Sequence, residues 1–302
     1  MKTPRDLSAS SRRMVSHWKQ TLGGITALLI LAPVAGKAQI VITEFGQTLT
    51  ENFDSMGTSD KTSLPAFWKA ERLQGGAPYP VRQLGNYATA GTMTTRREGD
   101  LTGNTAGIIN FGAGDAATAL DRALGFHSNS NPDSGAQSGN IYAQFQNNTG
   151  QSLSMVSLAY DVEKYRTGTN PAGYRFQLSY SFDGVNWTDA GDDFRTYFGP
   201  DAGNDGYVTA PGVVMPVSGT VTFNTPVADG GLFYLAWNYS VASGGDRPDS
   251  IQNEVRNAQA LAIDNFSLKA IPEPSSLAAL TLAAFALVTG GRRWWKHRTN
   301  RA

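Results

Sequence analysis

Two carboxylates on one expected strand come nearest to a catalytic pair in this chain. Asp161 and Glu163 are two residues apart, and the period of two in a β-strand puts both side chains on the same face. Their Cβ atoms would be roughly 6 to 7 Å apart, within the range of about 5 to 10 Å that separates the two acids of glycoside hydrolases. The same pair also fits a solvated strand face, with Lys164, Arg166 or Arg175 as a cross-strand partner. We favour the solvated face, and a secreted glycoside hydrolase stays open as an alternative.

Oxygen-rich loops are weak candidates for a metal site, and the ion that they suit is calcium. Asp201 and Asp205 frame the segment Asp-Ala-Gly-Asn-Asp-Gly, and Asp264 belongs to a late strand. Ca²⁺ takes six to eight oxygen ligands from flexible loops. The spacing matches no EF-hand loop, and Asp, Asn and Gly are also the ordinary residues of turns. We expect no cofactor other than structural calcium on these residues.

Aromatic side chains beside polar groups are the residues that could bind a sugar, because the apolar face of a pyranose stacks on an aromatic ring. Trp187, Tyr197 and Tyr207 are the candidates, with Tyr165 as a further one. Trp187 follows an expected turn at Asp183-Gly184, where a tryptophan commonly packs against its own hairpin. A platform for extracellular polysaccharide and simple hairpin packing both fit this pattern.

Motifs of the common enzyme classes are absent from the sequence. It contains no Gly-x-Ser-x-Gly, no His-Glu-x-x-His and no phosphate-binding glycine loop. Of its three histidines, His17 and His297 lie near the ends, which leaves His127 for any triad. The chain has no cysteine, so thiol nucleophiles and thiolate metal sites are excluded. We therefore expect a protein that is not an enzyme.

The elements that must carry these residues are β-strands. Tyr174 to Tyr180 and Val156 to Val162 alternate apolar with polar residues, which predicts half-buried strands. Leu232 to Trp237 is apolar on both faces, as in a central strand. Further short runs, separated by turn residues, are Ile40–Phe45, Ile108–Phe111, Ile141–Phe145, Thr220–Phe223 and Leu261–Leu268. This pattern predicts an all-β domain, a β-sandwich or jelly roll, over residues 39–270. Two segments, Asp115–Gly125 and Ser250–Ala260, could instead be short helices.

Charge is distributed unevenly along the chain. The whole sequence has a formal charge of zero, but residues 39–271 contain 14 Lys and Arg against 23 Asp and Glu, a net charge of −9. Binding of phosphates requires clustered basic residues, so we expect no nucleic-acid partner. Neutral sugars and divalent cations remain compatible with an acidic surface.

The N-terminal segment has the features of a signal peptide. Arg12, Arg13 and Lys19 precede an apolar stretch from Leu22 to Val34, and small residues follow at Gly36 and Ala38. Signal peptidase reads small residues at such positions. We predict a signal helix within residues 1–38, with cleavage between Ala38 and Gln39. A retained anchor is the alternative, although the apolar stretch is short for one.

Three signals follow one another at the C-terminus. Pro272-Glu273-Pro274 precedes an apolar run from Leu277 to Val288, and a basic cluster begins at Arg292 and Arg293. The run is about half to two-thirds of the roughly 20 residues of a stable membrane span, and the basic cluster would stay cytoplasmic. This order resembles the sorting signal of PEP-CTERM proteins, a class of bacterial exported proteins.

The resemblance implies a route for residues 271–302. A short transmembrane helix would hold the chain in the inner membrane until the membrane enzyme exosortase removes or exchanges the tail near Pro274. The protein would then be displayed on the cell surface or released into the extracellular matrix. Such proteins often occur in bacteria that make extracellular polysaccharide, so a polysaccharide is the expected partner besides the two processing enzymes.

A second resemblance covers nearly the whole middle of the chain. The segments that carry it are Glu51–Met56, Leu64–Trp68, Asp121–Gly125, Asn147–Gly150 and Ala260–Leu268. They look like a recurrent bacterial extracellular sandwich module, whose members include sugar-binding domains and parts of adhesins. Such a likeness implies a fold and assigns no activity. We expect an exported protein that acts by binding or as a structural component.

Overall fold

The computed structural model describes residues 39–74, 84–99, 106–127, 136–169, 173–241 and 258–272. These residues form two β-sheets of seven strands each, and none of them is in an α-helix. The predicted all-β sandwich is therefore confirmed. The signal helix and the C-terminal hydrophobic helix fall outside the described residues.

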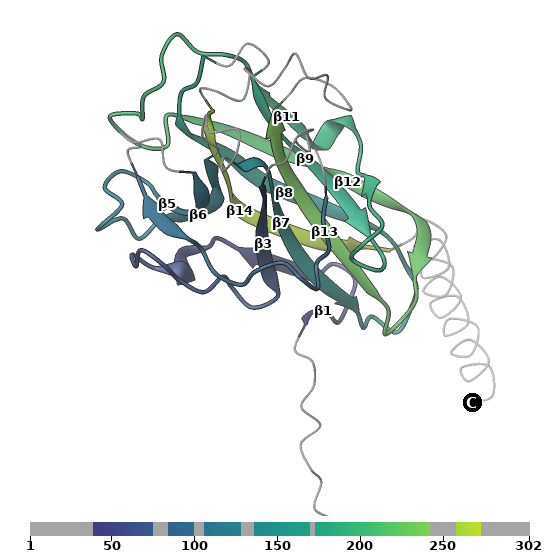
Figure 1. Cartoon of the computed structure of the whole chain (residues 1–302). Helices are drawn as coiled ribbons and strands as arrows, with labels where there is room; N and C mark the ends of the chain where they lie inside the picture. The colour runs from purple at the N-terminus through teal and green to yellow at the C-terminus, as the bar shows by residue number, and fades with distance from the viewer. Residues whose placement is uncertain are drawn as a thin grey trace, which may run out of the picture. The chain divides into compact units, whose positions relative to one another are not determined.

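The first sheet is built around β7 and β13, which lie side by side near its centre (Figure 1). Five strands pair in the order β1 (Ile40–Ile42), β7 (Ala136–Asn147), β13 (Leu232–Val241), β9 (Tyr174–Ser181) and β10 (Thr188–Asp189). In addition, β3 (Trp68–Gln74) pairs with β7, and β11 (Arg195–Phe198) pairs with β9. β1 is parallel to β7, and the other pairs are antiparallel.

The second sheet is built around β8, which pairs with β12 on one side and with β14 on the other. Six strands pair in the order β12 (Val213–Val227), β8 (Leu153–Arg166), β14 (Ala260–Ile271), β6 (Arg122–His127), β5 (Gly107–Gly112) and β4 (Arg96–Glu98). In addition, β2 (Thr48–Glu51) pairs with β14. Two 3-10 turns, η1 (Asp54–Met56) and η2 (Asp192–Phe194), complete the regular structure.

The core lies between the sheets, where the apolar side of each strand is buried. On β8 the inward residues are Val156, Leu158, Tyr160 and Val162, as their alternation predicts. Trp237 of β13 stacks on Trp68 of β3 at 5.4 Å between ring centroids. Phe266 of β14 packs edge-on against both rings. Aromatic rings thus join the two layers at their centre.

One of the two expected helices is wrong. Asp115 begins a turn, in which its side chain accepts a hydrogen bond from Ala117 N–H at 2.7 Å and its carbonyl accepts one from Ala119 N–H at 2.8 Å. The chain then enters β6 at Arg122, because pairing with β5 and β14 outweighs the local helical pattern. Most of the other segment, Ser250–Ala260, lies outside the described residues.

β14 changes its partner at a bulge in the middle of the strand. Ile263 pairs with Leu124 of β6, whereas Phe266 pairs with Glu51 of β2. Between these pairs the register against β8 shifts, and Asn265 has a positive φ of 50°. A bulge bends a strand and re-aims its side chains, so this one turns Asn265 outward at the edge where β2 begins to pair.

Among the described residues, no helix is long and apolar enough to cross a membrane.

Candidate functional site

A surface groove runs along the edge of the second sheet, where β2 pairs with β14. Its larger hollow, of about 490 Å³, is lined mainly by polar residues, although its walls expose polar and apolar surface about equally. The adjoining hollow, of about 250 Å³, has mainly apolar walls, and both share Thr50, Glu51 and Phe266. We call the two together the β2 groove. Its polar side chains are Thr50, Glu51, Asn52, Ser55, Asn265 and Ser267, and its apolar ones are Ile40, Leu49, Ala66, Phe67, Trp68 and Phe266.

Backbone strain is concentrated at this groove. In the described ranges only three residues other than glycine have a positive φ: Phe53 at 58°, Phe67 at 70° and Asn265 at 50°. Phe67 and Asn265 line the groove, and Phe53 follows Asn52 of its wall. Left-handed backbone costs about 1 to 3 kcal/mol for bulky residues such as Phe53 and Phe67, and less for asparagine, which adopts it more readily. Strain of this kind is characteristic of sites that must hold a defined shape for a ligand.

Hydrogen bonds hold each strained residue in place. The carbonyl of Phe67 accepts bonds from Gln144 N–H at 3.3 Å and from the Tyr87 hydroxyl at 3.2 Å. Phe53 N–H donates to Glu51 Oε1 at 2.8 Å. Asn265 N–H donates to the side chain of Asp264 at 2.7 Å. The groove walls are therefore fixed by the sandwich itself, before any ligand arrives.

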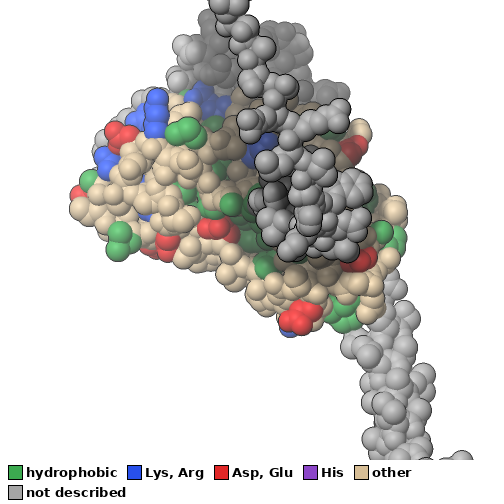
Figure 2. Space-filling model, turned by 90° about the horizontal axis from the view of Figure 1, so that it is seen from below, with side chains coloured by type: hydrophobic (Ala, Val, Ile, Leu, Met, Phe, Trp, Pro, Cys, Tyr) green, Lys and Arg blue, Asp and Glu red, His purple; other side chains and the backbone are tan. Residues whose placement is uncertain are grey.

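Glu51 is the charged side chain of the groove lining. Partial burial raises its pKa, the nearby Asp54 raises it further, and the backbone N–H groups of Phe53 and Asn52 lower it. No Lys or Arg lines either hollow. In Figure 2 the Lys and Arg side chains gather mainly in one part of the visible surface, while acidic ones are scattered over all of it. The groove is thus a hydrogen-bonding surface with a negative charge.

The solvated strand face expected for the carboxylate pair is wrong for Glu163, whereas Asp161 is partly exposed. Glu163 is only 7% exposed, and its carboxylate accepts a hydrogen bond from the Tyr165 hydroxyl at 2.7 Å. Burial raises the pKa of Glu163 to about 7. Asp161 accepts a bond from Asn265 Nδ2 at 3.0 Å. Neither acid lines either hollow of the β2 groove, so the two do not form a catalytic pair there.

Asp264 is the third acid of this region and is 1% exposed. Burial is the main cause that raises its pKa to about 8, the hydrogen bond from Asn265 N–H lowers it, and the charge of Glu163 raises it. Asp264 and Asp161 are direct cross-strand partners on β14 and β8. Among the residues that the structure describes, no group of three or more acidic or histidine side chains is arranged to hold a metal ion.

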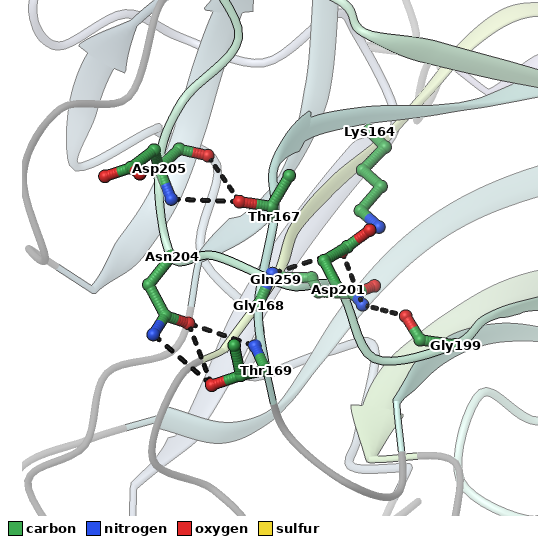
Figure 3. Close-up of polar contacts among 9 residues, drawn as sticks. All are labelled: Lys164, Thr167, Gly168, Thr169, Gly199, Asp201, Asn204, Asp205 and Gln259. Carbon is green, nitrogen blue, oxygen red and sulfur yellow. Dashed lines mark hydrogen bonds and ion pairs between the residues drawn. The ribbon is translucent and has the colours of Figure 1, made fainter.

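Asp201 and Asp205, the other calcium candidates, brace loops at one end of the sandwich (Figure 3). Asp201 forms a buried ion pair with Lys164 of β8, and its Oδ2 accepts a bond from Gly168 N–H at 3.2 Å. Gln259 Nε2 lies 3.4 Å from the same oxygen. Asp205 bonds to the Thr167 hydroxyl through its backbone N–H and carbonyl, both at 2.9 Å. An ammonium thus already balances the charge of Asp201.

The three predicted aromatic residues do not form one platform. Trp187 packs against Tyr142 with tilted rings, 5.3 Å between centroids, and donates from Nε1 to the Gly85 carbonyl at 2.9 Å, so it lies on the outer face of the first sheet. Tyr197 is 52% exposed and pairs with Arg175, near the opposite end of β9 from the Thr188 pair. Tyr207 is half-buried in the loop before β12. Several strand rises of about 3.3 Å separate the first two.

The predicted processing residues bracket the described domain. Gln39 immediately precedes β1, and Pro272 follows the last residue of β14. Ala38, Glu273, Pro274, Arg292 and Arg293 lie outside the described residues.

Sequence reasoning did not find the β2 groove, although it singled out the segments that build it. In the sequence, Glu51–Met56 and Ala260–Leu268 indicated only a type of fold, and in the structure both segments supply residues to the groove walls. The available signal was their polar composition, with Glu51, Asn52 and Ser55 in one segment and Asn265 and Ser267 in the other. Their proximity is a consequence of pairing between β2 and β14.

Comparison with protein-family models and with curated proteins finds no match for this sequence. Several solved β-structures are similar at low identity. The K1 cleaved adhesin domain of Lys-gingipain from Porphyromonas gingivalis W83 has 14% identity and a TM-score of 0.35, over 75% of this chain and 100% of that one.

Two carbohydrate-binding modules are also similar. The CBM22-1 xylan-binding domain of Paenibacillus barcinonensis Xyn10C has 10% identity and a TM-score of 0.30, over 76% of this chain and 98% of its own. TmCBM61, solved with β-1,4-galactotriose, has 11% identity and a TM-score of 0.26, over 50% of this chain and 71% of its own. Similarities at this level identify no ligand for this chain.

Proposed function

We propose that this chain is an exported protein that binds polysaccharide through the β2 groove and does not change it chemically. The observation that carries the proposal is the coincidence of the groove with the three strained residues Phe53, Phe67 and Asn265. A rigid groove loses little conformational entropy when a ligand binds, which favours affinity.

The groove lining supports a sugar ligand. Hydroxyl and amide side chains on its polar half can exchange hydrogen bonds with sugar hydroxyls, and these groups specify orientation in ligand sites. On its apolar half, the half-buried ring of Phe67 can contact the C–H face of a pyranose. The net charge of −9 over residues 39–271 disfavours polyanions.

Catalysis is not part of the proposal. The buried Glu163 has the raised pKa of an acid catalyst, but it lies outside both hollows of the groove. Glu51 does line the groove, but one of its carboxylate oxygens already accepts a hydrogen bond from Phe53 N–H.

Export and sorting are proposed from the sequence. We infer that signal peptidase cleaves at Ala38–Gln39 and that exosortase acts at Pro272-Glu273-Pro274, which leaves the sandwich on the cell surface or in the extracellular matrix. The described domain is compatible with this route, because its strands begin at Ile40 and end at Ile271.

The binding proposal is tested with the processed protein in affinity electrophoresis through gels that contain xylan, galactan, dextran, cellulose ether or chitosan. We expect at least one polysaccharide to retard the protein. Ser55→Trp, which fills the groove from an exposed position, should abolish the retardation, while Ser218→Trp on the exposed face of β12 should not. Retardation that survives Ser55→Trp would place the binding site elsewhere.

A further inference from the structure

We propose that the β2 groove selects a polysaccharide whose sugars carry free amino groups, with one ammonium held against Glu51. This inference depends on the proposed function and narrows its ligand.

Uncompensated negative charge around the polar half of the groove is the first argument. Glu51 lies in the wall, Asp54 follows Asn52 in the same segment, and Asp161 holds the amide of Asn265 in the opposite wall. None of these three carboxylates forms an ion pair within the described ranges. An arriving cation would therefore meet negative charge at Glu51 and Asp161, whereas the charge of Arg122 partly offsets that of Asp54.

All three carboxylates accept hydrogen bonds from uncharged N–H groups. Glu51 accepts from Phe53 N–H at 2.8 Å, and Asp161 accepts from Asn265 Nδ2 at 3.0 Å. Asp54 accepts from Asn52 Nδ2 at 2.6 Å and from the backbone N–H of Arg122 at 2.9 Å. These bonds fix the carboxylates in position and leave their charge in place.

The nearby basic side chains are directed elsewhere. The guanidinium of Arg122 donates to the Asn110 side chain at 2.9 Å and to the carbonyls of Ala116 and Ala119. Lys269 follows the groove residue Ser267 on β14, but its side chain extends toward Gly46 in the turn before β2. Among the described residues, no Lys or Arg lines the groove beside Glu51, so a ligand is the expected source of a cation there.

An ammonium would be attracted more strongly to the partly buried Glu51 than to a carboxylate on an open surface. The partly desolvated carboxylate and its neighbour Asp54 repel each other, and both effects raise the pKa of Glu51. An ammonium beside Glu51 relieves this repulsion, and the interaction is stronger where water is partly excluded. The negative charge of the whole domain also attracts cationic ligands from a distance.

An amino sugar fits the lining better than a basic peptide. The side chains beside Glu51 are the hydroxyls and amides of Thr50, Asn52, Ser55 and Ser267, which suit a ligand with many hydroxyl groups. An amino group on a sugar ring is also held close to those hydroxyls, whereas a lysine carries its ammonium on a flexible stem.

The test is calorimetric titration of the processed protein at pH 6 and low salt with three hexasaccharides: β-1,4-linked glucosamine, its fully N-acetylated form and cellohexaose. We expect the glucosamine hexamer to bind about tenfold more tightly than the other two. Glu51→Gln keeps the acceptor for Phe53 N–H and should remove this preference, while Glu44→Gln at an exposed position outside the groove should preserve it.

Each other outcome has a distinct meaning. Equal affinity for the three hexamers would overturn the amino-sugar inference and leave polysaccharide binding standing. Spermidine or polylysine that binds as tightly as the glucosamine hexamer would also overturn it, because a simple cation would then suffice. Absence of binding to all three hexamers would also overturn the inference, and only absence of retardation by every polysaccharide in the gels would remove the proposed function as well.

Discussion

At the scale of single residues, Lys164 and Asp201 are the most consequential ion pair. The side chain of Lys164 is 4% exposed and that of Asp201 is 28% exposed. Removal of one partner from such a buried pair leaves an uncompensated charge in a poorly solvated site. The pair also joins the loop after β11 to the end of β8, so it both balances the charge of Lys164 and holds that loop in place.

Asp201→Asn should therefore lower the free energy of unfolding by about 3 to 5 kcal/mol. Chemical denaturation of the processed protein measures this change. The matched control is Asp192→Asn, which breaks the exposed pair with Arg195 and should cost about 1 kcal/mol or less. Equal effects of the two substitutions would contradict the assignment of Lys164 as a buried cation.

Glu163 and Asp264 make stability depend on pH. Their pKa values, about 7 and about 8 in the folded protein, exceed the ordinary values near 4 of an unfolded chain. The folded protein thus holds these two protons more tightly. Their contribution to stability is complete below about pH 4 and is lost as the pH rises through about 7 and 8.

We expect the urea midpoint of unfolding to fall between pH 5 and pH 9 at constant ionic strength. Asp264→Asn should reduce this fall, since a neutral side chain has no charge to bury. Asp193→Asn, at an exposed position in η2, should leave the fall unchanged. A midpoint that rises over this range in the parent protein would rule out the stated origin.

At the scale of elements, close approach of β6 and β14 depends on Gly125. A Cβ atom at this position would lie 2.1 Å from the carbonyl oxygen of Leu261 and 2.4 Å from the Cα of Ala262. Both contacts are with backbone of the neighbouring strand, which cannot move aside as a flexible side chain can. Gly125 is thus required for the register in which the first part of β14 pairs with β6, before its second part pairs with β2.

Gly125→Ala should destabilise the protein by about 3 kcal/mol or prevent folding. Gly203→Ala is the control, because its new Cβ would lie 3.5 Å from Asp205 Oδ2, an ordinary contact. Thermal unfolding followed by circular dichroism compares the two. If Gly125→Ala unfolded at the same temperature as the parent, the tight pairing of β6 with β14 would be incorrect.

At the scale of the whole molecule, the two ends and the middle have different roles. The basic residues are concentrated toward the ends, and the acidic residues toward the sandwich. Removal of the ends would change a chain of zero formal charge into a domain of charge −9. The proposed processing would therefore determine which charge the protein presents to the proposed polysaccharide ligand.

Replacement of Pro272, Glu273 and Pro274 by alanine should block C-terminal processing. The variant should keep its N-terminal cleavage and accumulate in the inner membrane with its tail intact. Intact-mass measurement and sequencing of both termini decide this, with the parent expected to begin at Gln39 and end near Pro274. Normal processing of the variant would refute the sorting hypothesis.

The sequence by itself determined the class of fold, because the period of two in residues such as Tyr174 to Tyr180 is a local property of the chain. The half-buried state predicted for this strand is wrong, because both faces of β9 are buried. The sequence placed the central strand Leu232–Trp237 correctly, since an element covered on both faces must be apolar on both. It failed at Asp115–Gly125, where local helical signals were overridden by pairing with neighbouring strands.

The tertiary structure alone decided where the functional residues meet. Glu163 looked like a solvated residue by alternation, yet the outer face of the second sheet is covered there, and the side chain is buried. Glu51 and Asn265 are far apart in sequence, and only the pairing of β2 with β14 beyond the bulge makes them walls of one groove. Periodicity reports which side of a strand faces a core, whereas the contacts across strands depend on register and on what covers each sheet.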